Sequence, residues 1–281
     1  MIPSRLKGCR KAVFSFSGGR TSAYMTLTLI NELEAKGVEC VVVFANTGLE
    51  DWRTLEFIHK CDFHYGLKTI WLEPVVHHGV RKGCTHKVVN YATALGENDQ
   101  LMESVIKKYG IPNMGFPHCT RELKLNPMRS YLKSISFTGK DTMTLIGIRS
   151  DEADRMNKDF EKNRYWYPLV DMGVTKQDVL KWWKERPFDL EVPEHRGNCV
   201  WCWKKSYRKL CTLYKENPEI FDQPKRLEKL YKNQRPERGG QSFFRKGLDT
   251  GAIIKMAKEG NFKIFEDPNY ENSCKESCEP L

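Results

Sequence analysis

Residues 11–30 read Lys11-Ala12-Val13-Phe14-Ser15-Phe16-Ser17-Gly18-Gly19-Arg20-Thr21-Ser22-Ala23-Tyr24-Met25-Thr26-Leu27-Thr28-Leu29-Ile30. The apolar run at residues 11–14 is typical of a buried strand, and residues 23–30 keep apolar side chains at helical spacing. A strand, a glycine pair and a helix start favour phosphate binding. Glycines let the backbone turn tightly, and a helix N-terminus directs N–H groups and partial positive charge at an anion. The plainer interpretation is a strand-to-helix turn with a serine N-cap.

Serines at both ends of the glycine pair favour the phosphate site over the plain turn. The hydroxyl groups of Ser17, Thr21 and Ser22 add hydrogen-bond donors, and Arg20 adds a full positive charge. The predicted ligand-binding residues of this loop are Ser15, Ser17, Gly18, Gly19, Arg20, Thr21 and Ser22.

Further apolar runs predict an α/β fold with a doubly wound parallel sheet. Residues 40–45, 68–72 and 142–148 are expected strands, and helical patterns separate them, the first from about Thr21 to Lys36. Ligands of such sheets bind beyond the carboxyl ends of the strands. The loop at residues 17–22 and the loop at Asn46, Thr47 and Gly48 are both expected at that edge.

Composition narrows the class of protein. Lys and Arg number 46 against 36 Asp and Glu, a formal net charge of +10, which favours acidic partners such as nucleotides or nucleic acid. No stretch approaches the length of a membrane span, and the first residues lack a signal-peptide core. We expect a soluble, cytoplasmic protein without membrane contact.

The ten cysteines point to metal binding or redox chemistry, because nothing indicates secretion. Cys199-Val200-Trp201-Cys202 places two thiolates within reach of one metal, and the pattern alone leaves zinc, an iron–sulfur cluster and a redox dithiol open. Cys119 precedes an expected helix, whose dipole favours thiolate. Cys40 and Cys61 are interpreted as buried small hydrophobic residues.

Three segments carry a family resemblance. Ser17-Gly18-Gly19-Arg20-Thr21-Ser22 resembles the S-G-G-x-x-S pyrophosphate loop of the adenine nucleotide α-hydrolase superfamily. The segments 44–50 and 147–155 resemble two blocks of its phosphoadenosine phosphosulfate (PAPS) reductase branch, the second with the pattern G-x-R-x-x-E-x-x-R.

The resemblance implies that the chain binds ATP or PAPS. Asn46, Thr47, Gly48, Gly147 and Arg149 would lie beside the nucleotide. Ser17, Arg149 and Arg155 would be catalytic, because arginine grips phosphate or sulfate with two hydrogen bonds. Thr21 stands where many members have an aspartate that contacts Mg²⁺, so Mg²⁺ is the least supported of the implied cofactors.

The resemblance also implies a cysteine-ligated [4Fe–4S] cluster, in preference to zinc. Its expected ligands are Cys119, Cys199, Cys202 and Cys84, with His118 or Cys211 as other choices for the fourth. Three cysteines and an open iron site would resemble cluster-dependent tRNA thiolases. Four would resemble adenylyl-sulfate reductases.

We expect a nucleotide-binding domain at residues 1–206 that includes the cysteine site. Residues 207–281 are expected to form a smaller, mainly helical, basic region with a polar tail. Cys274 and Cys278 of that tail are candidate nucleophiles, although the tail lacks the Glu-Cys-Gly-x-His/Leu element of PAPS reductases.

Three functions remain open at this stage. The first is sulfur chemistry on an adenine nucleotide, either adenylyl-sulfate reduction with a thioredoxin-like reductant or sulfur transfer. The second is an ATP pyrophosphatase that adenylates and thiolates tRNA or DNA by means of an iron–sulfur cluster. The third is a non-catalytic subunit that binds nucleotide or nucleic acid within a larger complex such as a ribonucleoprotein.

Overall fold

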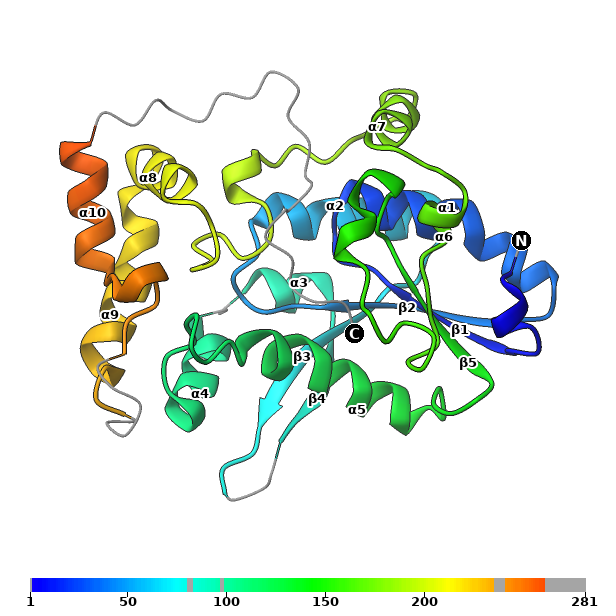
Figure 1. Cartoon of the computed structure of the whole chain (residues 1–281), viewed down its shortest axis with the longest axis horizontal. Coiled ribbons are helices and arrows are strands. Elements are labelled where there is room, and N and C mark those ends of the chain that lie inside the picture. Colours follow the sequence, from blue (N-terminus) through cyan, green and yellow to red (C-terminus); the bar gives the residue numbers. More distant parts are fainter. Residues whose placement is uncertain (1, 80–82, 97–98, 235–240, 261–281) are drawn as a thin grey trace.

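The computed structural model describes residues 2–79, 83–96, 99–234 and 241–260 (Figure 1). Six strands of this part of the chain form one sheet in the order β4-β3-β2-β1-β5-β6. The strands are β1 (Lys11–Ser15), β2 (Glu39–Ala45), β3 (Ile70–Val76), β4 (Cys84–Val89), β5 (Thr142–Ile146) and β6 (Tyr165–Trp166). Neighbouring strands are parallel except β3 and β4. The strand order reverses at β1, so the predicted doubly wound α/β fold is confirmed.

Helices connect the strands and form most of the region after the sheet. The α-helices are α1 (Arg20–Ala35), α2 (Trp52–Tyr65), α3 (Tyr91–Leu95), α4 (Asp99–Tyr109), α5 (Asn126–Ser134), α6 (Pro168–Asp171), α7 (Lys176–Lys184), α8 (Tyr207–Glu216), α9 (Asp222–Tyr231) and α10 (Thr250–Glu259). Shorter helical turns are η1 (Ser4–Leu6), η2 (Arg121–Leu125), η3 (Ser150–Arg155), η4 (Glu194–Arg196), η5 (Pro218–Phe221) and η7 (Arg245–Gly247). In the described residues, no helix is both long enough and apolar enough to cross a membrane.

Both faces of the sheet are covered, as the continuous apolar strands require. Ala12 and Phe14 of β1 belong to a core cluster with side chains of α1, α2 and α7. Val13 points to the opposite face and shares a core cluster with Met128 and Leu132 of α5. The alternation along β1 therefore places one helical layer on each side of the sheet.

A third core cluster lies beside the sheet and joins distant parts of the chain. It contains Val105 and Ile106 of α4, Trp201, Leu210 of α8 and Ile253 of α10. Figure 1 shows α8, α9 and α10 grouped at one end of the molecule, with α4 below the sheet on the same side. The helical C-terminal region thus shares its core with α4, far earlier in the chain.

The edge strand β4 is absent from the sequence-based prediction. It pairs antiparallel with β3, and Cys84 is its one buried residue, the others being exposed or half-buried. The run Cys84-Thr85-His86-Lys87-Val88-Val89 is half polar because one of its faces meets solvent, so it lacks the continuous apolar signal of β2. The expected all-parallel sheet is corrected to one with an antiparallel edge strand.

Two helix starts follow the local sequence signals. Asp51 caps α2 by accepting a hydrogen bond from the backbone N–H of Arg53 at 3.1 Å. Thr175 and Asp178 form a capping box at the start of α7. These contacts fix where each helix begins relative to the loop before it.

The carboxyl end of β5 meets the first turn of α1 with no room for a side chain. A Cβ placed on Gly147 would lie 2.8 Å from the Cα of Ser22 and 3.1 Å from its backbone N. Glycine at residue 147 is therefore a packing requirement for the approach of α1 to the sheet.

Gly147→Ala is expected to destabilise the fold by about 1–3 kcal/mol, because the added methyl group meets backbone rather than a side chain that can rotate. Thermal unfolding measures the effect. Gly115→Ala is the matched control, since its Cβ would meet only the Asn113 side chain at 3.5 Å. An equal melting temperature for Gly147→Ala and the unchanged protein would contradict this packing.

A carboxylate on α4 holds α9 in place. Glu103 accepts hydrogen bonds from the Tyr231 hydroxyl at 2.7 Å and from Arg226 Nη2 at 2.8 Å. These bonds lower the pKa of Glu103 to about 2. A lowered folded-state pKa gives stability above the unfolded pKa of the carboxyl, and that stability is lost as the pH falls towards the folded value.

Glu103→Gln is expected to lower the unfolding free energy by about 1 kcal/mol near neutral pH. Its difference from the unchanged protein should shrink as the pH falls below about 4.5, the ordinary glutamate pKa, towards about 2. Urea unfolding of both proteins across this pH range tests it. Glu259→Gln, at an exposed α10 residue, is the control, and a pH-independent difference for Glu103→Gln would contradict the assignment.

Candidate functional site

The loop between β1 and α1 has the backbone form that phosphate binding requires. Gly18 adopts φ +80°, the left-handed region, and a Cβ there would lie 2.7 Å from Thr54 Cγ2. Gly19 is the N-cap of α1, where neither a side-chain cap nor a first-turn carboxylate is present. The positive end of α1 is therefore not neutralised by its own sequence, a condition that favours an anion.

Hydrogen bonds between two serines close this loop. Ser22 donates its hydroxyl proton to the Gly19 carbonyl at 3.0 Å, and its Oγ accepts from the Ser17 backbone N–H at 3.2 Å. The two hydroxyl oxygens lie 3.0 Å apart. Ser22 is buried whereas Ser17 is exposed, so Ser22 shapes the loop and Ser17 faces a ligand. Ser15 ends β1 between β2 and β5.

Arg20 pairs with a carboxylate far along the chain, and its buried Nη1 has no hydrogen-bond partner among the described residues. Its Nε and Nη2 atoms donate to the two carboxylate oxygens of Asp189 at 2.6 and 2.9 Å, and Nη2 also donates to the Leu190 carbonyl at 2.6 Å. Trp183 Nε1 donates to the Arg20 carbonyl at 3.1 Å. Arg20 therefore attaches the segment after α7 to the start of α1. Its role as a phosphate ligand stays a prediction.

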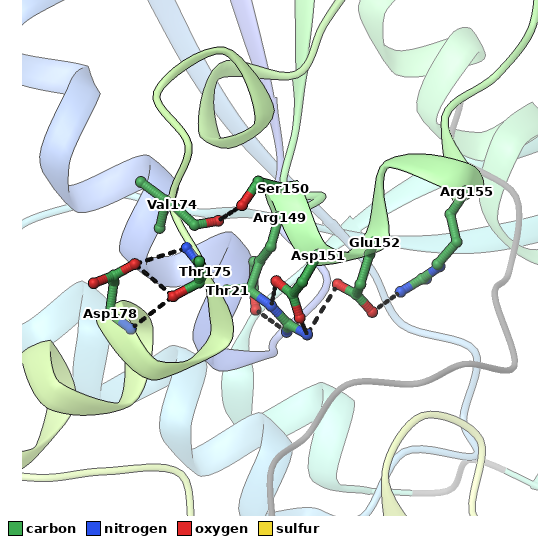
Figure 2. Close-up of polar contacts among 9 residues, drawn as sticks. All are labelled: Thr21, Arg149, Ser150, Asp151, Glu152, Arg155, Val174, Thr175 and Asp178. Carbon is green, nitrogen blue, oxygen red and sulfur yellow. Dashed lines mark hydrogen bonds and ion pairs between the residues drawn. The ribbon is translucent and has the colours of Figure 1, made fainter.

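Figure 2 shows the charged residues after β5. Arg149 is 3% exposed and lies between the loop and two carboxylates. Its Nη1 donates to Thr21 Oγ1 at 3.2 Å, its Nε and Nη2 donate to Asp151 at 3.0 Å each, and Nη2 lies 3.4 Å from Glu152. The hydrogen bonds from Arg149 lower the pKa of Asp151. Arg155 binds Glu152 from its other side.

Thr21 occupies the loop position at which a metal-binding aspartate would stand in many related loops. Here its hydroxyl accepts a hydrogen bond from Arg149. Arg149 and Arg155 are both paired with carboxylates, and their role as anion ligands stays a prediction. The loop at residues 17–22 contains no carboxylate that could bind Mg²⁺, and Mg²⁺ binding stays a prediction.

The loop after β2 is ordered by its own polar side chains. Asn46 is fully buried, donates to Glu73 Oε1 at 2.8 Å and accepts from the Gly48 N–H at 3.1 Å. Thr47 donates from its backbone N–H and its hydroxyl to Glu50, at 2.9 and 2.7 Å. Because β1 pairs with both β2 and β5, this loop and the two regions above meet at one edge of the sheet.

The cysteine segment docks on the loop after β2. The Sγ atom of Cys199 lies 3.5 Å from Thr47 Oγ1, and the Val200 N–H donates to the Leu49 carbonyl at 2.7 Å. Cys199 also forms an isolated antiparallel bridge with Glu50. A thiol from residue 199 therefore reaches the same edge as the loop at residues 17–22. No local sequence pattern predicts this contact between Thr47 and Cys199.

Charged contacts fix residues 194–196, which come just before Cys199 and Cys202. Lys209 of α8 pairs with Glu194 at 2.9 Å, and His195 Nε2 lies 2.6 Å from a Glu216 oxygen. Burial lowers the pKa of His195. Arg196 lies 3.6 Å from the Asp51 carboxylate, which also caps α2. The segment is thus fixed to α8 on one side and to α2 on the other.

The expected metal ligands are not gathered into one site. Cys119 and Cys199 pack against the same core cluster, and Cys202 follows Cys199 in a turn closed by a 3.0 Å backbone hydrogen bond. Cys84 is buried, and burial together with the Glu122 carboxylate raises the pKa of its thiol to about 12, which disfavours the thiolate that metals bind. In the described ranges, no three Cys, His, Asp or Glu side chains are arranged to hold a metal ion.

Binding of a [4Fe–4S] cluster or a zinc ion by Cys84, Cys119, Cys199 and Cys202 stays a prediction. Cys274 and Cys278 lie outside the described residues. Cys61 is fully buried and burial raises its pKa, as expected for a core residue.

A family model and several known proteins match this chain. The phosphoadenosine phosphosulfate reductase domain matches residues 11–187. A nin region protein of Escherichia phage lambda, ORF290, is 33% identical over 95% of this chain and 94% of its own length. An uncharacterized protein of Methanocaldococcus jannaschii is 24% identical over 85% of this chain, which spans 45% of that protein.

Among solved structures, the U34-tRNA thiolase NcsA from Methanococcus maripaludis, solved with its [4Fe-4S] cluster, aligns with a TM-score of 0.42 and 18% identity. The alignment covers 96% of this chain and 81% of NcsA. Similarity of this degree assigns no function to the chain. The family match spans more than half of the 281 residues, and on that ground the chain belongs to the phosphoadenosine phosphosulfate reductase domain family.

Proposed function

We propose that this protein binds an adenine nucleotide and uses it for sulfur chemistry at Cys199. The observation that carries the proposal is the 3.5 Å contact between Cys199 Sγ and Thr47 Oγ1. It brings a thiol to the sheet edge at which the loop of residues 17–22 and the positive end of α1 lie.

The phosphates of the nucleotide bind at the start of α1. Exposed Ser17 and the backbone N–H groups of the loop donate to them, while buried Ser22 keeps the loop closed. Thr21, which accepts from Arg149, lies on the side of the loop that faces β5. A terminal phosphate or sulfate there would share the Arg149 guanidinium with Asp151.

The reaction that these groups support best is ATP-dependent sulfur transfer. An oxygen of the acceptor attacks the α-phosphorus of ATP, and pyrophosphate leaves. The acceptor oxygen, a poor leaving group by itself, is now part of AMP, which leaves readily. The outer sulfur of a Cys199 persulfide then displaces AMP. A second thiolate, for which Cys202 is the nearest in sequence, attacks the Cys199 sulfur, forms a disulfide and frees the thiolated product. A thioredoxin-like thiol reductant then reduces the disulfide, and a persulfide donor restores the persulfide on Cys199.

The family match supports a second candidate, reduction of PAPS. A thiolate attacks the sulfonate sulfur, adenosine bisphosphate leaves, and a thiosulfonate forms on the cysteine. A second thiol then releases sulfite and leaves a disulfide, which a thioredoxin-like protein reduces. Cys199 is the described thiol at the nucleotide edge, whereas Cys274 and Cys278 are the tail candidates.

Ser17→Ala is expected to weaken nucleotide binding by roughly tenfold, the loss of one hydrogen bond to a charged group. Calorimetric titration with ATP, AMP, PAPS and adenosine bisphosphate measures it and identifies the preferred nucleotide. Ser134→Ala is the matched control, because Ser134 is exposed on α5 and bonds only its own helix backbone. Unchanged affinity for every nucleotide in Ser17→Ala would refute phosphate binding by this loop.

Cys199→Ser is expected to abolish sulfur transfer while leaving nucleotide affinity unchanged, because a serine hydroxyl can keep the contact with Thr47 Oγ1 but carries no sulfur. The assays are RNA- or DNA-stimulated pyrophosphate release with incorporation of labelled sulfur, and sulfite release from PAPS. Cys40→Ser is the control, since Cys40 lies at the opposite end of β2. Full activity of Cys199→Ser, or nucleotide binding without turnover in every assay, would rule out this role.

A further inference from the structure

A pocket of about 500 Å³ opens beside the cysteine segment. Residues 48–52 after β2 form one wall, residues between 196 and 201 form the second, and residues between 219 and 226 of η5 and α9 form the third. No residue of the loop at 17–22 is among the described residues that line it. The size falls within the range of small-molecule sites, and the pocket is separate from the phosphate-binding loop.

Trp52 gives the pocket an aromatic surface. It is the first residue of α2 and is 58% exposed, whereas Trp201 on the facing wall is 2% exposed. Trp201 donates to Gln223 Oε1 at 2.7 Å, which fixes that wall. An exposed indole at the mouth of a pocket offers a stacking face for a planar ligand.

The charge of the pocket selects against phosphate. Its lining holds four carboxylates, Glu50, Asp51, Glu219 and Asp222, against the two arginines Arg196 and Arg226. Both arginines are already paired with carboxylates, Arg196 with Asp51 and Arg226 with Glu103. Glu50, Asp51 and Glu219 already accept hydrogen bonds within the protein, from Thr47, Arg53 and Asn217. The lining nevertheless holds more carboxylates than arginines, which favours a ligand that carries hydrogen-bond donors, such as the exocyclic amino group of cytosine or guanine.

The pocket adjoins the backbone on both sides of the bridge between Glu50 and Cys199. Val200 lines it, and Glu50 both lines it and forms the bridge with Cys199. We propose that this pocket binds the acceptor of the sulfur chemistry, a nucleobase that stacks on Trp52 and carries both an amino group and the carbonyl oxygen that the proposed reaction adenylates, as cytosine and guanine do. The inference rests on the proposed function for its link to sulfur, whereas base binding itself is independent of it. The base is supplied either by a free nucleoside or by a nucleic acid strand.

The test is titration with adenosine, cytidine, guanosine and uridine, and with short single-stranded RNA and DNA of mixed sequence, all at saturating ATP. Cytidine and guanosine should bind more tightly than uridine. Trp52→Ala should weaken their binding roughly fivefold or more, the range for loss of one base–aromatic stack, and Trp52→Phe should retain most of it. Phe63→Ala is the matched control, because Phe63 is a 79% exposed aromatic residue of the same helix outside the pocket.

Tighter binding of a strand than of any nucleoside would assign the base to nucleic acid, and equal binding would assign it to a free nucleoside. Binding of spermidine that depends on Trp52 would show a cation site and overturn the proposal. So would a lack of binding by every nucleoside and oligonucleotide, or unchanged affinity in Trp52→Ala. A loss of ATP affinity in Trp52→Ala equal to that in Ser17→Ala would make the pocket part of the nucleotide site instead.

Alkylation of Cys199 tests the link to the thiol. A bound nucleoside should slow the reaction of Cys199 with iodoacetamide, followed by mass spectrometry, in the unchanged protein but not in Trp52→Ala. Equal rates with and without nucleoside would remove the acceptor role. If nucleosides bind through Trp52 but ATP binds nowhere, the base site stands and the proposed function fails.

Discussion

The close approach of backbone segments around the start of α1 is the constraint on which the site depends. Gly18 turns with a positive φ against Thr54, and Gly147 meets the backbone of Ser22. Neither contact leaves space for a Cβ. Glycine, which has no side chain, is therefore needed at both positions for these segments to approach one another. This geometry presents the positive end of α1 at the carboxyl edge of the sheet, where the β2 loop and Arg149 also lie.

The charged side chains at this edge are paired before any ligand arrives. Arg20 is held by Asp189, Arg149 by Asp151 and Glu152, and the same Glu152 binds Arg155. Paired arginines keep a fixed orientation, which lowers the entropy lost on binding, yet an anion must share them with carboxylates. Under the proposed function, the start of α1 would therefore bind an anion without displacing a carboxylate, because its first turn carries none.

Local signals made the strand–loop–helix segment at residues 11–35 and the neighbouring strands predictable. Each of these elements lies within a short stretch of sequence, and the pattern of residues in that stretch determines its structure. The same holds for the helix caps Asp51 and Thr175. The contact of Thr47 with Cys199 and the pair of Arg20 with Asp189 join residues more than 150 positions apart, and no periodicity encodes them. Strand β4 escaped prediction because half of it faces solvent. The family resemblance implied a ligand set that includes Cys84, and no local pattern predicted that the Cys84 thiol lies beside the Glu122 carboxylate.

The central claim is that the phosphates of an adenine nucleotide bind at the start of α1, on the same edge as Cys199. Its most direct test is a crystal structure of the protein with a non-hydrolysable ATP analogue. We predict phosphate oxygens within hydrogen-bond distance of Ser17 Oγ and the backbone N–H groups of residues 18–22, on the side of the loop that faces Thr47. Phosphates bound elsewhere, with the loop at residues 17–22 empty, would contradict the account.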